Sequence, residues 1–309
     1  MIRYGYACVN MTLTNRPKKL GGRVTTSRTA RKASWYPHNL QLISDKALEN
    51  AQDLLTYLKW NEEHGITLFR VGSELFPWHD HYELHDLPDY EKIADKLFEC
   101  GEYAREHGHR LTTHPGPFHV LGSPRQEVVE KSIIGLERHS EMFDLMGYEP
   151  SFHNKINIHV GAHYNDKPMA LANFNRNFHR LSEAAKTRLT VENDDKASLY
   201  STKELYEGVH EKIGIPIVFD YHHHKFCTGG QDEEEALLTA CMTWGDIRPV
   251  VHYSQSRATE HNDPKIRANA HSDSYWTAIN LYNLDLDIML ECKHKEIGLY
   301  KMRELMEVA

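Results

Sequence analysis

The chain has 309 residues, of which 40% are hydrophobic and 26% are charged, and its formal net charge is −8. This balance is typical of a globular protein, and no stretch reaches the roughly 18 consecutive apolar residues that a membrane-spanning helix needs. The five cysteines are scattered and never form a CxxC pair, which argues against a disulfide framework or a zinc ribbon. Because no apolar signal segment follows the first residue, we expect a cytoplasmic protein with reduced thiols.

Short β-branched or aromatic runs alternate with longer amphipathic stretches along the whole chain. The expected strands are 3–8, 68–72, 110–113, 155–159, 188–191, 216–219, 249–252 and 287–290. The expected helices are 46–64, 89–107, 126–146, 167–186, 202–213, 232–243 and 271–283. Eight strands alternating with helices predict an α/β protein of the (β/α)8 TIM-barrel type, with residues 1–309 as a single domain.

Positive charge is concentrated near the start of the chain. The first 44 residues contain eight Lys or Arg and no Asp or Glu. Salt screens charges that lie more than about 10 Å away, so a local basic segment can bind phosphates even on an acidic chain. We therefore expect this segment, with Arg16, Lys18 and Lys19, to contact a nucleic-acid backbone. The alternative is a solvated loop with a chance cluster of charges.

Histidine, aspartate or glutamate closes most of the expected strands. These residues are His114, His159, Glu192, Asp220, His252 and Glu291. The carboxyl ends of barrel strands converge on one face, where active sites are built. One such residue is more often a satisfied polar group, but six of them removed from water together need a compensating cation. Imidazole and carboxylate ligands without thiolate suit Mn²⁺, Zn²⁺ or Fe²⁺, so we expect several divalent metals that could clamp a phosphodiester.

Two neighbouring segments offer further ligands. In the segment 220–224, the spacing from Asp220 lets His223 reach the same metal, whereas we expect His222 and His224 to lie outside the first set of ligands. In the loop after the second strand, either His79 or His81 could serve, and the spacing alone does not choose between them.

Several of these motifs, taken in order along the chain, resemble the ultraviolet damage endonucleases. The motifs are Gly5–Cys8, Arg70–His81, His114–Gly116, His159–Gly161, Arg188–Asp195, Asp220–His223, Val251–Ser254 and Asp287–Lys293. The resemblance covers nearly the whole chain, and the HPG and RLTxENDD elements are its most specific parts. It implies a TIM barrel similar to endonuclease IV with two or three divalent ions, usually Mn²⁺. It also implies hydrolysis of double-stranded DNA on the 5′ side of a pyrimidine dimer or other lesion.

The resemblance also implies particular site residues. The implied metal ligands are His81, His114, His159, Glu192, Asp220, His223, His252 and Glu291. In the loop after the second strand it selects His81 over His79, and it places Tyr6 and Asn10 close to the DNA. We expect Glu192 and Glu291 to hold the metals most closely and, with His252, to form the catalytic set.

Two positions depart from the family pattern. The family carries a Gln-Tyr pair after HPG that wedges into the duplex, whereas this chain has Pro117-Phe118. The aromatic plane is kept for stacking on DNA, but the amide and the phenol hydroxyl are absent. The family often has a lysine two residues before the histidine of the seventh strand, where this chain has Val250. That change removes a candidate ligand or charge from the predicted metal cluster.

Two other functions remain open from the sequence. A sugar isomerase or epimerase of the xylose-isomerase type also gathers Glu, Asp and His around divalent metal in a barrel. The basic first segment and the eight-ligand set favour a nuclease over such an enzyme. A catalytically weakened DNA-damage binder is the second alternative, which the changes at Val250 and Pro117 suggest. For the repair nuclease we expect a monomer that associates with the nucleoid when it acts on DNA and does not bind a membrane.

Overall fold

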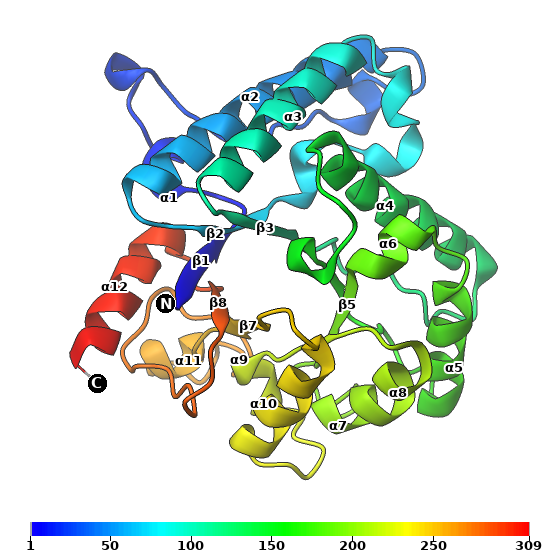
Figure 1. Ribbon diagram of the computed structural model, residues 1–309, viewed down its shortest axis with the longest axis vertical. Helices are drawn as coiled ribbons and strands as arrows, with labels where there is room; N and C mark the ends of the chain where they lie inside the picture. Colours follow the sequence, from blue (N-terminus) through cyan, green and yellow to red (C-terminus); the bar gives the residue numbers. More distant parts are fainter. Residues whose placement is uncertain (1, 309) are drawn as a thin grey trace.

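A computed structural model describes residues 2–308, and the outermost positions of the expected domain, 1 and 309, lie outside the described residues. Eight parallel strands form its centre (Figure 1). The strands are β1 (Arg3–Ala7), β2 (Leu68–Val71), β3 (Arg110–Thr113), β4 (Ile156–Ile158), β5 (Leu189–Glu192), β6 (Ile217–Val218), β7 (Val250–Tyr253) and β8 (Asp287–Leu290). Each of the eight expected strands overlaps one of these, so the strand prediction is confirmed.

The sheet closes into a barrel. Its order is β6-β5-β4-β3-β2-β1-β8-β7, and every neighbouring pair is parallel. Between the two edge strands, Asp220 and His252 form a parallel bridge, and the His252 backbone N–H donates to the Phe219 carbonyl at 2.9 Å. The predicted TIM-barrel class is therefore confirmed, and all strand carboxyl ends lie on one side.

Helices surround the strands (Figure 1). The longer ones are α2 (Leu40–Glu63), α3 (Tyr90–Glu106), α4 (Gln126–Leu145), α5 (Lys167–Phe178), α6 (Glu183–Arg188), α10 (Glu233–Cys241) and α12 (Lys295–Val308). The shorter ones are α1 (Met11–Thr14), α7 (Thr202–Leu205), α8 (Glu211–Ile213), α9 (Tyr221–His224) and α11 (Arg257–Glu260). In α2, Ala47, Ala51, Leu54 and Leu58 repeat at helical spacing and are buried in the core.

Two helix predictions differ from the structure. The expected helix 167–186 is divided into α5 and α6, because the Ser182 side chain accepts from the Ala185 N–H and caps a new helix. The expected helix 271–283 is wrong, since this described segment is irregular. Its Asp273 and Ser274 N–H groups donate to the Glu260 carboxylate, so contacts outside the segment satisfy donors that a helix would satisfy internally. The helix α12 was not among the expected helices, although Leu299 and Met302 are buried on one of its faces.

A buried ion-pair network fills the amino-terminal end of the barrel, opposite the predicted metal ligands. Asp287, at the start of β8, accepts from Arg110 at 2.9 Å and from Arg3 at 3.1 Å. The Arg110 and Asp287 side chains are completely buried. Because the network joins β1, β3 and β8, it fixes the strands whose opposite ends build the site.

Candidate metal centre

Seven of the eight predicted metal ligands lie together at the carboxyl ends of the strands. They form three overlapping groups within which the ligand atoms are all within 4.8 Å of one another. The groups are His114, His159 and Glu192; Glu192, Asp220 and His223; and Asp220, His252 and Glu291. Four of the seven follow strands, namely His114 after β3, His159 after β4, Asp220 after β6 and Glu291 after β8. His223 lies in α9, while Glu192 and His252 belong to β5 and β7. The barrel thus gathers in space residues that lie up to 177 positions apart, from His114 to Glu291.

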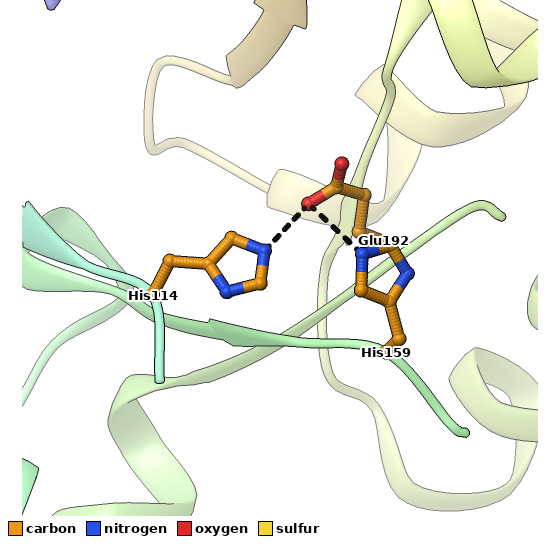
Figure 2. A group of neighbouring side chains, drawn as sticks. All are labelled: His114, His159 and Glu192. Carbon is orange, nitrogen blue, oxygen red and sulfur yellow. Dashed lines mark ion pairs between the residues drawn. The ribbon is translucent and has the colours of Figure 1, made fainter. Parts of the chain in front are cut away.

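Glu192 is the centre of this arrangement. Its Oε2 lies 3.2 Å from His114 Nε2, 3.9 Å from His159 Nε2 and 3.1 Å from His252 Nδ1. Figure 2 shows the first two imidazoles directed at the same carboxylate oxygen. Burial alone would raise the pKa of Glu192, but the His252 and His159 charges outweigh it and hold the pKa well below its ordinary value. The carboxylate is therefore ionised and available to a cation.

Glu291 forms the other side of the cluster. Its Oε1 lies 3.2 Å from His252 Nδ1 and is paired with the guanidinium of Arg70, which reaches it from β2. Burial acts to raise the pKa of Glu291, but Arg70 and then His252 lower it overall. A fully charged carboxylate is held in place by a residue that is not itself a ligand.

One carboxylate oxygen of Asp220 has no partner among the described residues, and a bound cation would satisfy it. Its Oδ1 accepts from the His223 backbone N–H at 2.7 Å, whereas its Oδ2 is buried without a hydrogen-bond partner among the described residues. Burial raises the pKa of Asp220 to about 6. An orphaned carboxylate oxygen among imidazoles and two other carboxylates fits a set of oxygen and nitrogen ligands for divalent ions.

The structure does not bring His81 to this cluster. His81 closes a 3₁₀ turn, His79–His81, and its Nε2 lies 3.2 Å from Lys32 Nζ. The rings of Trp35, Tyr36 and Trp78 surround it with centroid distances of 6.2, 5.8 and 5.9 Å. In this conformation His81 belongs to the contact between its loop and the basic first segment.

His271 lies at the centre although sequence reasoning did not select it. Its Nδ1 is 3.8 Å from Glu291 Oε2, and its ring centroid is 6.0 Å from that of His223. The residue falls at the start of the segment that was wrongly expected to be a helix, so no strand end pointed to it. His222, expected outside the ligand set, packs 5.8 Å from His271, and both of its ring nitrogens lack hydrogen-bond partners among residues 2–308.

Three further polar residues support the ligands from inside the barrel. Arg70 holds Glu291, Asn157 Nδ2 donates to Glu192 Oε2, and Lys155 Nζ lies 3.3 Å from His252 Nε2. The sequence signal for these residues was a charged or amide side chain in or beside an otherwise apolar strand. Without the fold, that signal does not say which partner each residue meets.

Tyr6 and Asn10 are buried rather than presented to a ligand. The Tyr6 hydroxyl donates to Asn61 Oδ1 at 2.8 Å and accepts from Asn10 Nδ2 at 3.0 Å. Asn10 Oδ1 also caps α1 by accepting from the Leu13 N–H. Both side chains are fully enclosed and join β1 to α1 and α2, and their place close to the DNA stays a prediction.

The other predicted DNA contacts lie on accessible surface. Phe118 is 85% exposed, and Pro117 beside it lines two adjoining cavities. One cavity, of about 500 Å³, is lined by five of the seven gathered ligands, and the other, of about 790 Å³, is lined by residues that include Phe118 and Trp78. Lys18 and Lys19 are exposed, while Arg16 is half-buried and donates from Nε to the Gly22 carbonyl. Among residues 2–308, we find no helix long and apolar enough to cross a membrane.

A closed barrel with imidazoles and carboxylates at its strand ends defines a TIM-barrel protein with a candidate site for divalent metals. The chain belongs to the UV-endonuclease UvdE family, whose family model matches residues 2–309. It is 33% identical to a UV-damage endonuclease of Neurospora crassa over 97% of this chain, and 31% identical to a putative UV-damage endonuclease of Acanthamoeba polyphaga mimivirus over 98%. The chain spans 50% of the Neurospora protein and 90% of the mimivirus protein.

Solved structures agree with this family and with the fold. The crystal structure of SacUVDE shares 32% identity and a TM-score of 0.82, with 99% of this chain and 98% of the other covered. A D-tagatose 3-epimerase-like protein shares 14% identity and a TM-score of 0.51, covering 81% of this chain and 92% of the other. The second likeness shows the barrel fold alone, which explains why an isomerase was a reasonable alternative from sequence.

Proposed function

We propose that the protein is a DNA repair endonuclease that hydrolyses the phosphodiester immediately 5′ of UV photoproducts and other lesions in double-stranded DNA. The observation that carries this proposal is the group of seven His, Asp and Glu side chains at one end of the barrel. Family membership and the names of the relatives support the substrate and the class of reaction.

The side chains fit two or three divalent ions, for which we propose Mn²⁺. When bound, such ions activate water and stabilise charge on the phosphate and the leaving oxygen. Glu192 would be shared between ions, because it belongs to two of the three ligand groups. Asp220 would be shared in the same way, and Glu291, held by Arg70, would complete the third group. His252 contacts both Glu192 and Glu291, so it keeps the two carboxylates at a fixed separation.

The surface around the centre suits a damaged duplex. The exposed ring of Phe118 lines the cavity that adjoins the one with the candidate metal ligands, where it can stack on bases once the lesion has weakened pairing. Lys18 and Lys19 would bind the phosphate backbone, which carries no sequence information and therefore suits an enzyme that must act at any site.

The test is a nicking assay on a labelled duplex with one cyclobutane pyrimidine dimer, with Mn²⁺ and with a chelator. We expect a metal-dependent cut immediately 5′ of the dimer by the wild-type protein and none by Glu192→Gln. Glu183→Gln, which changes a carboxylate that is 90% exposed in α6, is the matched control and should cut normally. Cutting by folded Glu192→Gln at the wild-type rate would contradict the metal mechanism.

A weakened damage binder is the second candidate, and Pro117 and Val250 are the observations that favour it. Lesion-selective binding without any cut, on a dimer and on an abasic-site duplex, would select this function. Selective binding with cutting would exclude it.

A further inference from the structure

Three histidines form a separate cluster away from the strand-end ligands. His79 comes from the loop after β2, His119 from the loop after β3, and His139 from α4. The ring centroids of His79 and His139 are 4.8 Å apart, those of His119 and His139 are 5.8 Å apart, and those of His79 and His119 are 6.1 Å apart. The proposed nuclease mechanism uses none of these residues.

Each ring makes the same backbone contact. The Nδ1 atoms hydrogen-bond to backbone carbonyls, from His79 to Phe76 at 3.2 Å, from His119 to Gly116 at 3.0 Å, and from His139 to Gly135 at 2.7 Å. A carbonyl can only accept, so each Nδ1 carries the proton and each Nε2 presents a lone pair. Histidines that bind metals through Nε2 show this same contact at the other ring nitrogen.

Two of the three Nε2 lone pairs accept no hydrogen bond from the described residues. The Nε2 atoms of His79 and His139 are buried and have no hydrogen-bond partner among the described residues. Both rings line one small cavity, whose other walls include the apolar Leu75 and Met142 and the charged Arg138. Burial lowers the pKa of His79 to about 4 and that of His139 well below its ordinary value, so both rings are neutral near pH 7. Leaving two buried acceptors unpaired is unfavourable unless a ligand satisfies them.

The spacing of the rings suits a single ion. With Zn–N bonds of about 2.0–2.1 Å, imidazoles around tetrahedral zinc have ring centroids on the order of 5 Å apart. The ligand atoms are less closely gathered than those of the strand-end groups, so binding requires a ring to turn. His119 is the ring that must turn, because its Nε2 packs against Gly135, where an added Cβ would lie only 2.0 Å away.

We propose that His79, His119 and His139 form a second metal site, which takes a zinc ion through three imidazole nitrogens. An all-imidazole set without carboxylate prefers Zn²⁺ to Mn²⁺, in contrast to the strand-end centre. His79 and His119 also line the cavity of about 790 Å³, which leaves the fourth position of the ion open to water. The ion joins the loop of His79, the loop that carries Phe118, and α4.

The test is the zinc content of protein purified after incubation with zinc and removal of the unbound metal. We expect His139→Gln to hold one equivalent of zinc per chain less than the wild type. His179→Gln, which changes an exposed histidine just beyond α5, should match the wild type. Equal zinc content in folded His139→Gln and wild type would overturn the proposal.

Anomalous diffraction at the zinc edge decides the matter without relying on a variant. A peak between the three rings of the wild-type protein supports the site, whether or not His139→Gln folds. Peaks at the strand ends alone, with a water between His79 and His139, would contradict it. The result is independent of nicking, because the readout is the position of the ion.

Discussion

Lys155 and His252 meet inside the barrel, where Lys155 Nζ lies 3.3 Å from His252 Nε2 and both side chains are completely buried. The family resemblance places a lysine where this chain has Val250 in β7, whereas the amine beside His252 comes from the residue just before β4. It reaches the ring on the side opposite Nδ1, the atom that faces Glu192 and Glu291.

We expect Lys155→Met to weaken Mn²⁺ binding about 10-fold or more, since partners that orient ligand histidines typically contribute 10–100-fold to metal affinity. Methionine is close in volume and should keep the barrel folded. Titration of apo-protein with Mn²⁺ measures the effect, with the exposed Lys203→Met as the matched control. An unchanged dissociation constant for Lys155→Met would show that His252 needs no such partner.

Phe118→Ala should reduce the preference for damaged over undamaged duplex by about 5-fold or more, because stacking of one base on an aromatic ring is worth about 1–3 kcal/mol. Phe118→Tyr keeps the ring and should retain most of the preference. Competition binding with dimer-containing and intact DNA measures both variants. If Phe118→Ala discriminates as well as the wild type, the exposed ring has no part in recognition.

Lys18→Ala combined with Lys19→Ala should weaken binding to all DNA sequences alike. It should also reduce the dependence of affinity on salt by about one unit of slope for each phosphate that the variant no longer neutralises. The exposed Lys301 in α12 supplies the control, because Lys301→Ala removes a charge outside the basic first segment. Identical salt slopes for the double variant and the wild type would place the duplex elsewhere.

Gly101→Ala should destabilise the fold by about 1–3 kcal/mol, even though alanine is the better helix former. Gly101 lies in α3, and its added Cβ would come within 1.8 Å of the Met146 carbonyl oxygen at the end of α4. Urea unfolding measures the change, and Glu102→Ala, at the next and exposed position, should change stability little. A Gly101→Ala protein as stable as the wild type would mean that the two helices separate easily.

Acid should destabilise the protein partly through His79. Its pKa is lowered from an ordinary value of 6.5 to about 4 by burial and by His119, so between these values the unfolded chain binds a proton that the folded chain does not. The free energy of unfolding therefore falls as the pH falls from 6.5 to 4, by up to about 3 kcal/mol from this group. With chelator present, His79→Gln should show a shallower fall than the wild type or the exposed-site variant His85→Gln. Parallel pH profiles would contradict this assignment.

The sequence predicted the barrel and most of the centre because both depend on local signals. Each strand is a short apolar run, and the ligand that follows it, as His114 follows β3, is read at a fixed offset. Topology then brings the strand ends together without any knowledge of side-chain packing.

Residues on long loops could not be predicted in this way. His271 reaches the centre through a segment held by tertiary hydrogen bonds, and its amphipathic pattern resembles a helix. His81 matches a family motif but is held by Lys32 and aromatic rings of a distant segment. Tyr6 shows the reverse case, in which a matched residue is enclosed by packing that only the folded chain reveals.

The network around Asp287 has a consequence for synthesis on the ribosome. Arg3 contacts Asp287 across 284 positions, and β1 pairs with β8. The first strand can therefore pair on its second side only after β8 has been synthesised. Contacts of such high sequence separation form late and slow folding. Glu291 also arrives with β8, so a nascent chain cannot complete its third ligand group until translation is almost finished. A product that terminates before Glu291 therefore lacks part of the candidate metal centre.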